Sequence, residues 1–396
     1  MTAIPAPDVR RTGVVQGLAL LLPCTMAVMG TLVLAPVLPK LMIAFAAMPQ
    51  ARFWVPSILT TPALCLVFFS PLAGALGDRF GRRRLLVGAS IAYAAFGVAP
   101  IWLDNLYWII LTRIGVGLCE ATVLTLSTAL IGDLFNGAAR ERWLASQTAV
   151  ASISAILCLL AAGALGARFG WRGPFALYGL AVVLAGVVAR VVWEPEPPQR
   201  LTAPSHSSRL PWAKLSGICA ISVLGSILFY TIQIQMSVAL DALGVRDPAR
   251  IGGLIALASL GVPIGTVIFP LVARRPIALL LAAEFLVLGG AYGAMGQMTQ
   301  PGAFVVAAGV SMVGAGMIFP TLLTWALRQL PTPVRGLGTG IWQGVFSGGQ
   351  FLGGLLIAQL SVSFGGILPA LGALGGIALV AGVFALLAQA LVRRPG

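Results

Sequence analysis

Three ionisable side chains interrupt the long apolar segments of this chain. Arg113, Glu120 and Glu284 stand well inside such segments, although only 9% of all residues are charged. A charged group at the centre of a membrane helix costs about 2.5–3.5 kcal/mol on insertion scales, so it needs a partner, water or neutralisation. A carboxyl that can be neutralised can bind and release a proton. The chemistry that these residues suggest is therefore proton transfer.

Arg113 and Glu120 lie seven residues apart in one segment. In a helix this spacing is about two turns, roughly 10.5 Å of rise, on one face, so we expect both side chains to look into one cavity. Burial favours the neutral carboxyl and a nearby arginine favours the charged one, so a conformational change could switch its protonation. We predict Arg113 and Glu120 as the proton-coupling pair. For Glu284 we expect a protonated group beside lipid or one bonded to a neighbouring helix.

The most distinctive polar segment is residues 74–84, Gly-Ala-Leu-Gly-Asp-Arg-Phe-Gly-Arg-Arg-Arg, here named the basic loop. One acid and four arginines cannot lie in hydrocarbon, so the basic loop predicts a solvated turn between two spans. Asp78 can accept hydrogen bonds from arginines or from a helix N-terminus, and Asp133 is a second acid for the same arginines. Glycines allow close helix contact. The predicted gating contacts involve Gly74, Gly77, Asp78, Arg79, Gly81, Arg82, Arg83 and Asp133.

Aromatic and amide side chains recur at helical spacing in segments 213–240 and 337–361. Such surfaces suit an amphipathic organic ligand, and the alternative is helix–helix hydrogen bonding and packing. Ser222, near one end of the first segment, is expected to lie outside this surface. The predicted substrate cavity is lined by Tyr230, Gln233, Trp342, Phe346 and Gln350.

The elements that must position these groups are membrane helices. A hydrophobic fraction of 59% and a mean hydropathy of +0.98 exclude a soluble globular domain. Spanning helices need about 20 apolar residues, and the long, non-alternating segments exclude barrel strands. The predicted fold class is all-α, with twelve spans at residues 14–38, 53–75, 85–103, 106–132, 143–166, 173–193, 213–240, 251–273, 276–297, 302–327, 337–361 and 367–391.

Positive charge predicts the orientation. Of the 25 lysines and arginines, 18 fall on the side of both termini, six on the other side, and Arg113 lies within a span. This asymmetry predicts cytoplasmic termini in a multi-pass protein of the plasma membrane, which is the inner membrane if the source is Gram-negative. The net charge of +14 is spread over segment ends, so we expect lipid and not nucleic acid as its partner.

The sequence offers no constellation for catalysis or metal binding. All five cysteines lie in apolar segments without paired spacing, and the single histidine, His206, lies in a polar stretch. No nucleotide-binding loop is present. We therefore expect no enzyme activity, no catalytic residue, no metal and no cofactor.

A proline- and serine-rich stretch divides the spans six and six. The predicted organisation is an N-terminal six-helix bundle, a cytoplasmic linker and a C-terminal six-helix bundle at residues 1–193, 194–212 and 213–396. Phe169-Gly170 and Pro174 reappear 195 residues later as Phe364-Gly365 and Pro369, which favours an internal duplication.

The basic loop is similar to the loop between the second and third helices of the major facilitator superfamily, Gly-x-Leu-(small)-Asp-Arg-x-Gly-Arg-(Arg/Lys). The run Arg113-x-x-x-Gly117-x-x-x-Ala121 resembles the fourth-helix motif of the antiporters in that superfamily, whose arginine is associated with proton coupling. The resemblance implies two six-helix bundles with the substrate site between them. It also implies that the basic loop holds the cytoplasmic ends of the bundles together in the outward-open state.

The resulting hypothesis is a monomeric secondary transporter that moves a small organic solute by alternating access. Our first choice is proton-coupled efflux of a drug-like compound or a secreted metabolite. The alternatives are a proton symporter or uniporter that imports a small metabolite, and a non-transporting membrane receptor or assembly protein that kept the fold.

Overall fold

The computed structural model describes residues 13–194, 210–331 and 334–392, and every regular element within these ranges is helical. Eleven helical stretches of the described chain are long and apolar enough to cross a membrane. One of them runs for 55 residues, from Gly137 to Val191, and takes in nearly all of the predicted spans 143–166 and 173–193. The predicted all-α membrane fold is therefore confirmed.

The first half of the chain, up to Glu194, contains eight α-helices and three short 3₁₀ segments. Their bounds are α1 Val14–Leu21, α2 Pro23–Leu32, η1 Ala35–Val37, α3 Leu38–Ala44, α4 Ala51–Phe80, α5 Arg82–Val98, η2 Ala99–Trp102, α6 Leu106–Leu134, α7 Gly137–Phe169, η3 Gly170–Gly179 and α8 Leu180–Val191.

The described residues from Leu210 onward form seven α-helices. Their bounds are α9 Trp212–Ala242, α10 Pro248–Ser259, α11 Gly261–Val272, α12 Ile277–Met295, α13 Pro301–Gln329, α14 Arg335–Ser363 and α15 Ile367–Val392. Most of the predicted linker lies outside the described residues, so the proposed domain boundary stays a prediction.

Prolines interrupt two segments that were predicted as continuous spans. The first segment divides into α1, α2, η1 and α3, and Pro23 occupies the first turn of α2, where its missing N–H removes no helical hydrogen bond. The segment 251–273 divides at Leu260. There, Pro263 has no N–H to offer the carbonyl of Ser259, so the regular hydrogen-bond ladder fails.

The basic loop is far shorter than predicted. Helix α4 continues to Phe80 and α5 starts at Arg82, so the turn is confined to Gly81. Gly81 has φ +93°, a left-handed conformation that glycine adopts at little cost. Asp78 therefore lies on the last turn of α4. We call this end of the molecule the Gly81 end, and the end where α4 begins the opposite end.

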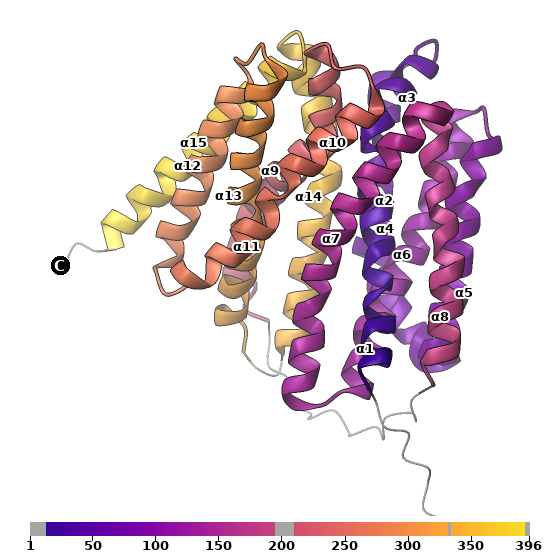
Figure 1. The fold of residues 1–396 in the computed structure, drawn as a ribbon. Helices are drawn as coiled ribbons and strands as arrows, with labels where there is room; N and C mark the ends of the chain where they lie inside the picture. The colour runs from indigo at the N-terminus through magenta and orange to yellow at the C-terminus, as the bar shows by residue number, and fades with distance from the viewer. Residues whose placement is uncertain (1–12, 195–209, 332–333, 393–396) are drawn as a thin grey trace, which may run out of the picture.

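The two halves approach each other most closely where glycine exposes the backbone. A Cβ on Gly163 of α7 would lie 2.7 Å from the carbonyl oxygen of Pro248, at the start of α10. A Cβ on Gly252 of α10 would lie 2.6 Å from the carbonyl oxygen of Leu159. We call this contact the glycine seam. Helices α7 and α10 run side by side here, toward the opposite end (Figure 1).

Candidate functional site

An ion-pair network at the Gly81 end joins three helices. Arg82 at the start of α5 donates to Asp78 Oδ1 from Nε at 3.0 Å and from Nη2 at 2.7 Å. Its Nη1 donates to Asp133 Oδ2 of α6 at 2.6 Å. The Asp78 side chain is 63% exposed, against 20% for Arg82. Solvated ion pairs are weak, typically about 0–1 kcal/mol, so this network can exchange partners at little cost.

Glu194 completes the network from the end of the first half. Its carboxylate accepts from the backbone N–H groups of Arg83 at 3.1 Å and Arg84 at 3.2 Å. The Arg83 guanidinium in turn donates to the carbonyl of Ala189 on α8. Helix α5 has no acid in its own first turn, so Glu194 supplies the anion that its N-terminus attracts.

Sequence reasoning missed Glu194 because it placed this residue in the linker. The available signal was an acid directly after the segment 173–193, on the same predicted membrane side as the three arginines that open α5.

The other predicted gating residues also make their contacts inside the first half. The Arg79 guanidinium lies 5.3 Å from the ring centre of Phe80. Gly77 and Gly74 pack against Leu126 and Thr125 of α6. Within the residues that the structure describes, the contacts of the network named above all lie between Gly74 and Glu194. These contacts do not bridge the two halves in this conformation.

Arg113 is enclosed by helices of the first half. Its side chain is fully buried, and Nη2 donates to the carbonyls of Phe96 at 3.1 Å and Gly97 at 3.3 Å. The guanidinium lies 4.8 Å from the ring centre of Tyr178 and 5.2 Å from that of Phe175. Arg113 therefore faces α5 and η3 in this conformation and does not line an open cavity. Such desolvated cation–π contacts contribute about 2 kcal/mol each.

Glu120 is buried at the contact between α6 and α2. It is 3% exposed, and its carboxyl packs directly against Gly30, where any Cβ would overlap Oε2. Within the described chain, Oε2 has no hydrogen-bond partner, and Arg113 lies in electrostatic reach without forming an ion pair. Glu120 also acts electrostatically on Tyr230 of α9. This acid therefore lies close to the boundary between the halves.

Five rings from three helices of the second half form an aromatic cluster. Phe319 of α13 lies 5.3 Å from Trp342 and 5.1 Å from Phe346, measured between ring centres. Tyr230 of α9 lies 6.0 Å from Phe346. Trp342 and Phe346 are fully buried here, so the predicted cavity side chains are brought together but not opened to solvent. The aromatic cluster consists of Phe229, Tyr230, Phe319, Trp342 and Phe346.

Two serines on α9 anchor this cluster. Trp342 Nε1 donates to Ser222 Oγ at 2.7 Å, and Ser226 Oγ donates to the carbonyl of Phe346. Ser222, which was expected to lie outside the cavity surface, thus contacts a side chain predicted for that surface. Its position on the sequence could not reveal a partner 120 residues away.

A crevice between α9 and α14, too narrow to admit a water molecule in this conformation, is lined by unpaired polar atoms. Gln350 Nε2 and Thr231 Oγ1 are buried without a hydrogen-bond partner among the described residues. Gly353 leaves space beside the Thr231 hydroxyl, because a Cβ at position 353 would lie only 3.3 Å from Thr231 Oγ1. Gln233, also predicted for the cavity, is 8% exposed and does not line this crevice. The crevice is lined by Tyr230, Thr231, Ile234, Gln235, Gln350, Gly353, Gly354 and Ile357.

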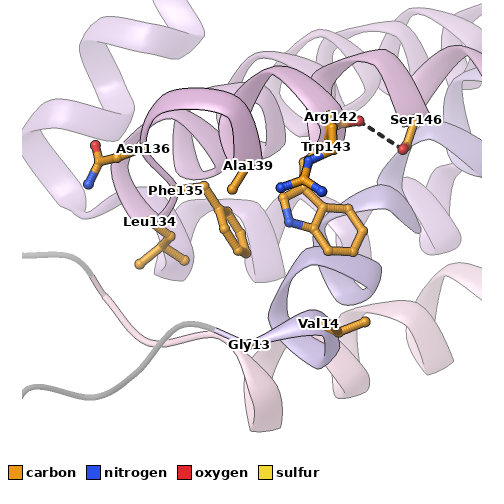
Figure 2. Close-up of a pocket in the computed structure, with 9 residues that line it drawn as sticks. All are labelled: Gly13, Val14, Leu134, Phe135, Asn136, Ala139, Arg142, Trp143 and Ser146. Carbon is orange, nitrogen blue, oxygen red and sulfur yellow. Dashed lines mark hydrogen bonds between the residues drawn. The ribbon is translucent and has the colours of Figure 1, made fainter.

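A larger pocket, of about 660 Å³, opens at the Gly81 end of the first half (Figure 2). Figure 2 shows the rings of Phe135 and Trp143 between α7 and the start of α1. The ring centres lie 5.6 Å apart. No residue predicted for the substrate cavity lines it. Its lining consists of Gly13, Val14, Leu134, Phe135, Asn136, Ala139, Arg142, Trp143 and Ser146.

The amino-acid sequence is similar to a known family of membrane proteins and to several of its members. Residues 20–331 match the profile of the Major Facilitator Superfamily. The class C tetracycline resistance protein of Escherichia coli is 29% identical over 215 residues, 52% of each chain. The bacillibactin exporter of Bacillus subtilis is 34% identical over 116 residues, 28% of each chain. The niacin transporter NiaP of Acinetobacter baylyi is 25% identical over 166 residues, 42% of this chain and 37% of NiaP. The chain thus spans about half, or less, of the length of these relatives.

Solved structures are similar over nearly the whole chain. A bacterial homologue of the human lysosomal transporter Spinster, in an inward-facing and unoccupied conformation, has a TM-score of 0.79 at 16% identity, covering 96% of this chain and 98% of that one. A single-residue mutant of the nucleoside transporter NupG has a TM-score of 0.76 at 10% identity and covers 96% of this chain and 100% of that one. At these identities the likeness establishes the fold alone.

Proposed function

We propose that this chain exports an amphipathic organic solute in exchange for protons. It belongs to the Major Facilitator Superfamily, and it is therefore a multi-pass secondary transporter and not an enzyme. The transported solute is small. It binds between the two halves, and alternating access opens this site to one side of the membrane and then to the other.

The observation that carries the proton-coupling proposal is the position of Glu120. Its carboxyl has one unpaired buried oxygen, a cation about two turns away on the same helix, and Tyr230 across the boundary. Movement of one half against the other changes the surroundings of this carboxyl more than those of Arg113, which is fixed by backbone carbonyls and rings. Conformation can therefore control whether Glu120 holds a proton.

The aromatic cluster and the crevice support an amphipathic substrate. The rings offer flat apolar faces, and the unpaired atoms of Gln350 and Thr231 offer hydrogen bonds without a fixed charge. A buried polar atom without a partner costs about 1–3 kcal/mol, and a ligand that satisfies it recovers this free energy. We place the substrate where α9 and α14 face α4, whose Thr60 lies against Gly354.

We further propose that the structure represents the state open at the Gly81 end, with both termini cytoplasmic in the plasma membrane. Among the described residues, all partners of the ion-pair network lie within the first half, and Asp78 is largely exposed. The glycine seam, where the halves are in contact, lies toward the opposite end. Asp78 would then bind the second half only when the Gly81 end closes.

Import of a small metabolite is the second candidate, and the match to the niacin transporter NiaP favours it. The two candidates differ in the direction of the proton gradient that drives uptake into vesicles. An antiporter accumulates solute in vesicles with an acidic interior, whereas a symporter does so when the exterior is acidic.

The test is uptake by purified protein in liposomes, with tetracycline and nicotinic acid as separate probes. Export by exchange predicts tetracycline accumulation with an acidic interior, above that in protein-free liposomes, and no such accumulation with Glu120→Gln. Nicotinic acid uptake driven by an acidic exterior would replace export with symport. Gradient-independent uptake of either probe would indicate a uniporter and remove Glu120 as a coupling acid.

A further inference from the structure

We propose that Glu284 of α12 is a second proton-binding site, in the half of the molecule that lacks Glu120, and that its bond to Thr321 controls the bending of α13 at Pro320. This assignment goes beyond the proposed function, which needs one coupling acid only. It rests on the carboxyl itself, on the backbone beside its partner, and on the ring that precedes that partner.

The Glu284 carboxyl is held by a single hydroxyl. Glu284 is 2% exposed, and Thr321 Oγ1 donates to its Oε1 at 2.5 Å. Oε2 is buried and has no hydrogen-bond partner in the described part of the chain. A neutral acid fits this environment, because an anion with a bare oxygen in apolar surroundings carries a large desolvation cost.

The helices packed against α12 bring no charge to this carboxyl. Helix α15 has no ionisable side chain in its described part, and the charge on α13 is Arg328, about two turns beyond Thr321. Tyr292 of α12 is itself occupied with the backbone of α9. The ionisable residues of α9 are Lys214, Cys219, Tyr230 and Asp241. Tyr230 faces Phe346, and the charged members lie near the helix ends.

Thr321 stands at a weak point of α13. Pro320 has no N–H, so the carbonyl of Gly316 loses its helical partner. Thr266 Oγ1 of α11 lies 3.2 Å from this carbonyl and shares its single proton with the nearer carbonyl of Val262, at 3.0 Å. At this level two hydroxyl groups tie α13 to its neighbours, one to α11 and one to Glu284. A helix bends most easily where a proline interrupts its ladder. The Glu284 bond thus holds the part of α13 that runs from Thr321 to the Gly81 end.

The same short stretch reaches the aromatic cluster. Phe319, the residue before Pro320, packs against Trp342 and Phe346. When Glu284 releases its proton to water, the remaining carboxylate requires water or a cation, so α12 and α13 must separate beside it. That separation moves Thr321, Pro320 and Phe319 together. Proton loss in the second half is thereby transmitted to the proposed substrate surface.

Infrared spectroscopy tests the proton site without any transported solute. Difference spectra of the purified protein between acidic and alkaline pH should contain the carbonyl stretch of a buried carboxylic acid that Glu284→Gln removes. Thr321→Val should keep this band and shift it to higher frequency, because the hydrogen bond is lost. Thr266→Val, which removes the neighbouring hydroxyl, should leave it unchanged. Identical spectra of Glu284→Gln and the wild type would overturn the proposal, as would equal shifts in the two threonine variants.

Thiol labelling tests the link to α13. With the five native cysteines replaced, Arg328→Cys should react faster at alkaline than at acidic pH by several-fold more than in the Glu284→Gln background, where ionisation of the thiol alone sets the pH dependence. The same pH dependence with Glu284 present and in the Glu284→Gln background would contradict the link, even if the infrared band is confirmed. Neither measurement uses a solute, so a failure of the export proposal would leave both results standing.

Discussion

The buried acids of the two halves are stabilised in different ways. Glu120 has Arg113 on its own helix and lies near the other half, whereas Glu284 has one hydroxyl and no nearby cation among the described residues. The first half can therefore balance a charged carboxylate internally, while the second half suits a neutral one. Conformation can consequently control the charge at Glu120, whereas at Glu284 a change of charge must drive the conformation.

The largest expected effect comes from removing the cation of the first half. Arg113→Leu leaves Glu120 without a counter-charge and the carbonyls of Phe96 and Gly97 without a donor. Each buried carbonyl left without a donor costs about 1–3 kcal/mol, so we expect a markedly lower thermal unfolding midpoint in detergent.

The matched control is Arg172→Leu, which also loses a ring contact, to Trp171, and loses an ion pair with Asp104. The Arg172 side chain is 40% exposed, so its pair contributes about 0–1 kcal/mol. Equal shifts of the midpoint in both variants would show that Arg113 is no buried counter-charge, and the contrast between the halves would fail.

Exchanging the two acids for amides tests the contrast through transport. Glu120→Gln should abolish acceleration of transport by a pH gradient while preserving part of the downhill exchange. Glu284→Gln should reduce that acceleration less, because it removes a site that tunes α13 and not the acid at the boundary. Full pH-driven transport by Glu120→Gln would transfer the coupling role to Glu284 or indicate a uniporter.

A smaller effect is expected on the substrate surface. Tyr230→Ala and Gln233→Ala should weaken the apparent affinity for a transported probe by roughly tenfold, about 1.4 kcal/mol. Ser216→Ala is the control on the same helix, because this exposed serine bonds to the nearby Ala213 carbonyl. Ser222→Ala should weaken the apparent affinity as the cavity variants do, because it removes the hydrogen-bond acceptor of Trp342. Equal affinities in all four variants would identify the surface as packing.

The smallest change in stability should follow Asp78→Asn. The ion pair is solvated, so unfolding should shift by less than about 1 kcal/mol while transport slows, because closure of the Gly81 end loses an anion. Asp104→Asn, an exposed acid in an ion pair with Arg172, serves as the control. Normal turnover of correctly inserted Asp78→Asn would remove Asp78 from the gate.

Most of the fold was predictable because apolar length and the basic loop carry strong local signals. The span 106–132 became α6, Leu106–Leu134, whereas Gly81 was predicted only for close helix contact and not as the turn itself. The proline breaks at Pro23 and Pro263 were missed, because each lies inside an apolar run that hydropathy treats as uniform.

The surroundings of the buried groups were not predictable. Tyr178 and Phe175, which cover Arg113, come from η3, and only the packed structure brings their rings to α6. The same holds for Thr321 at Glu284 and for Ser222 at Trp342. Helical periodicity identifies a face of one helix, and it does not identify what another helix presents to that face.

The glycine seam between α7 and α10 has a mechanical consequence. Gly163 and Gly252 bring bare backbone against bare backbone, so no side chains interlock at these two positions. Two interlocked helices must change rotamers before they can turn against each other, whereas two smooth surfaces can roll while staying in van der Waals contact. The seam can therefore serve as a pivot that keeps the halves in contact throughout the transport cycle, because their rotation against each other requires no change of side-chain rotamers at these positions.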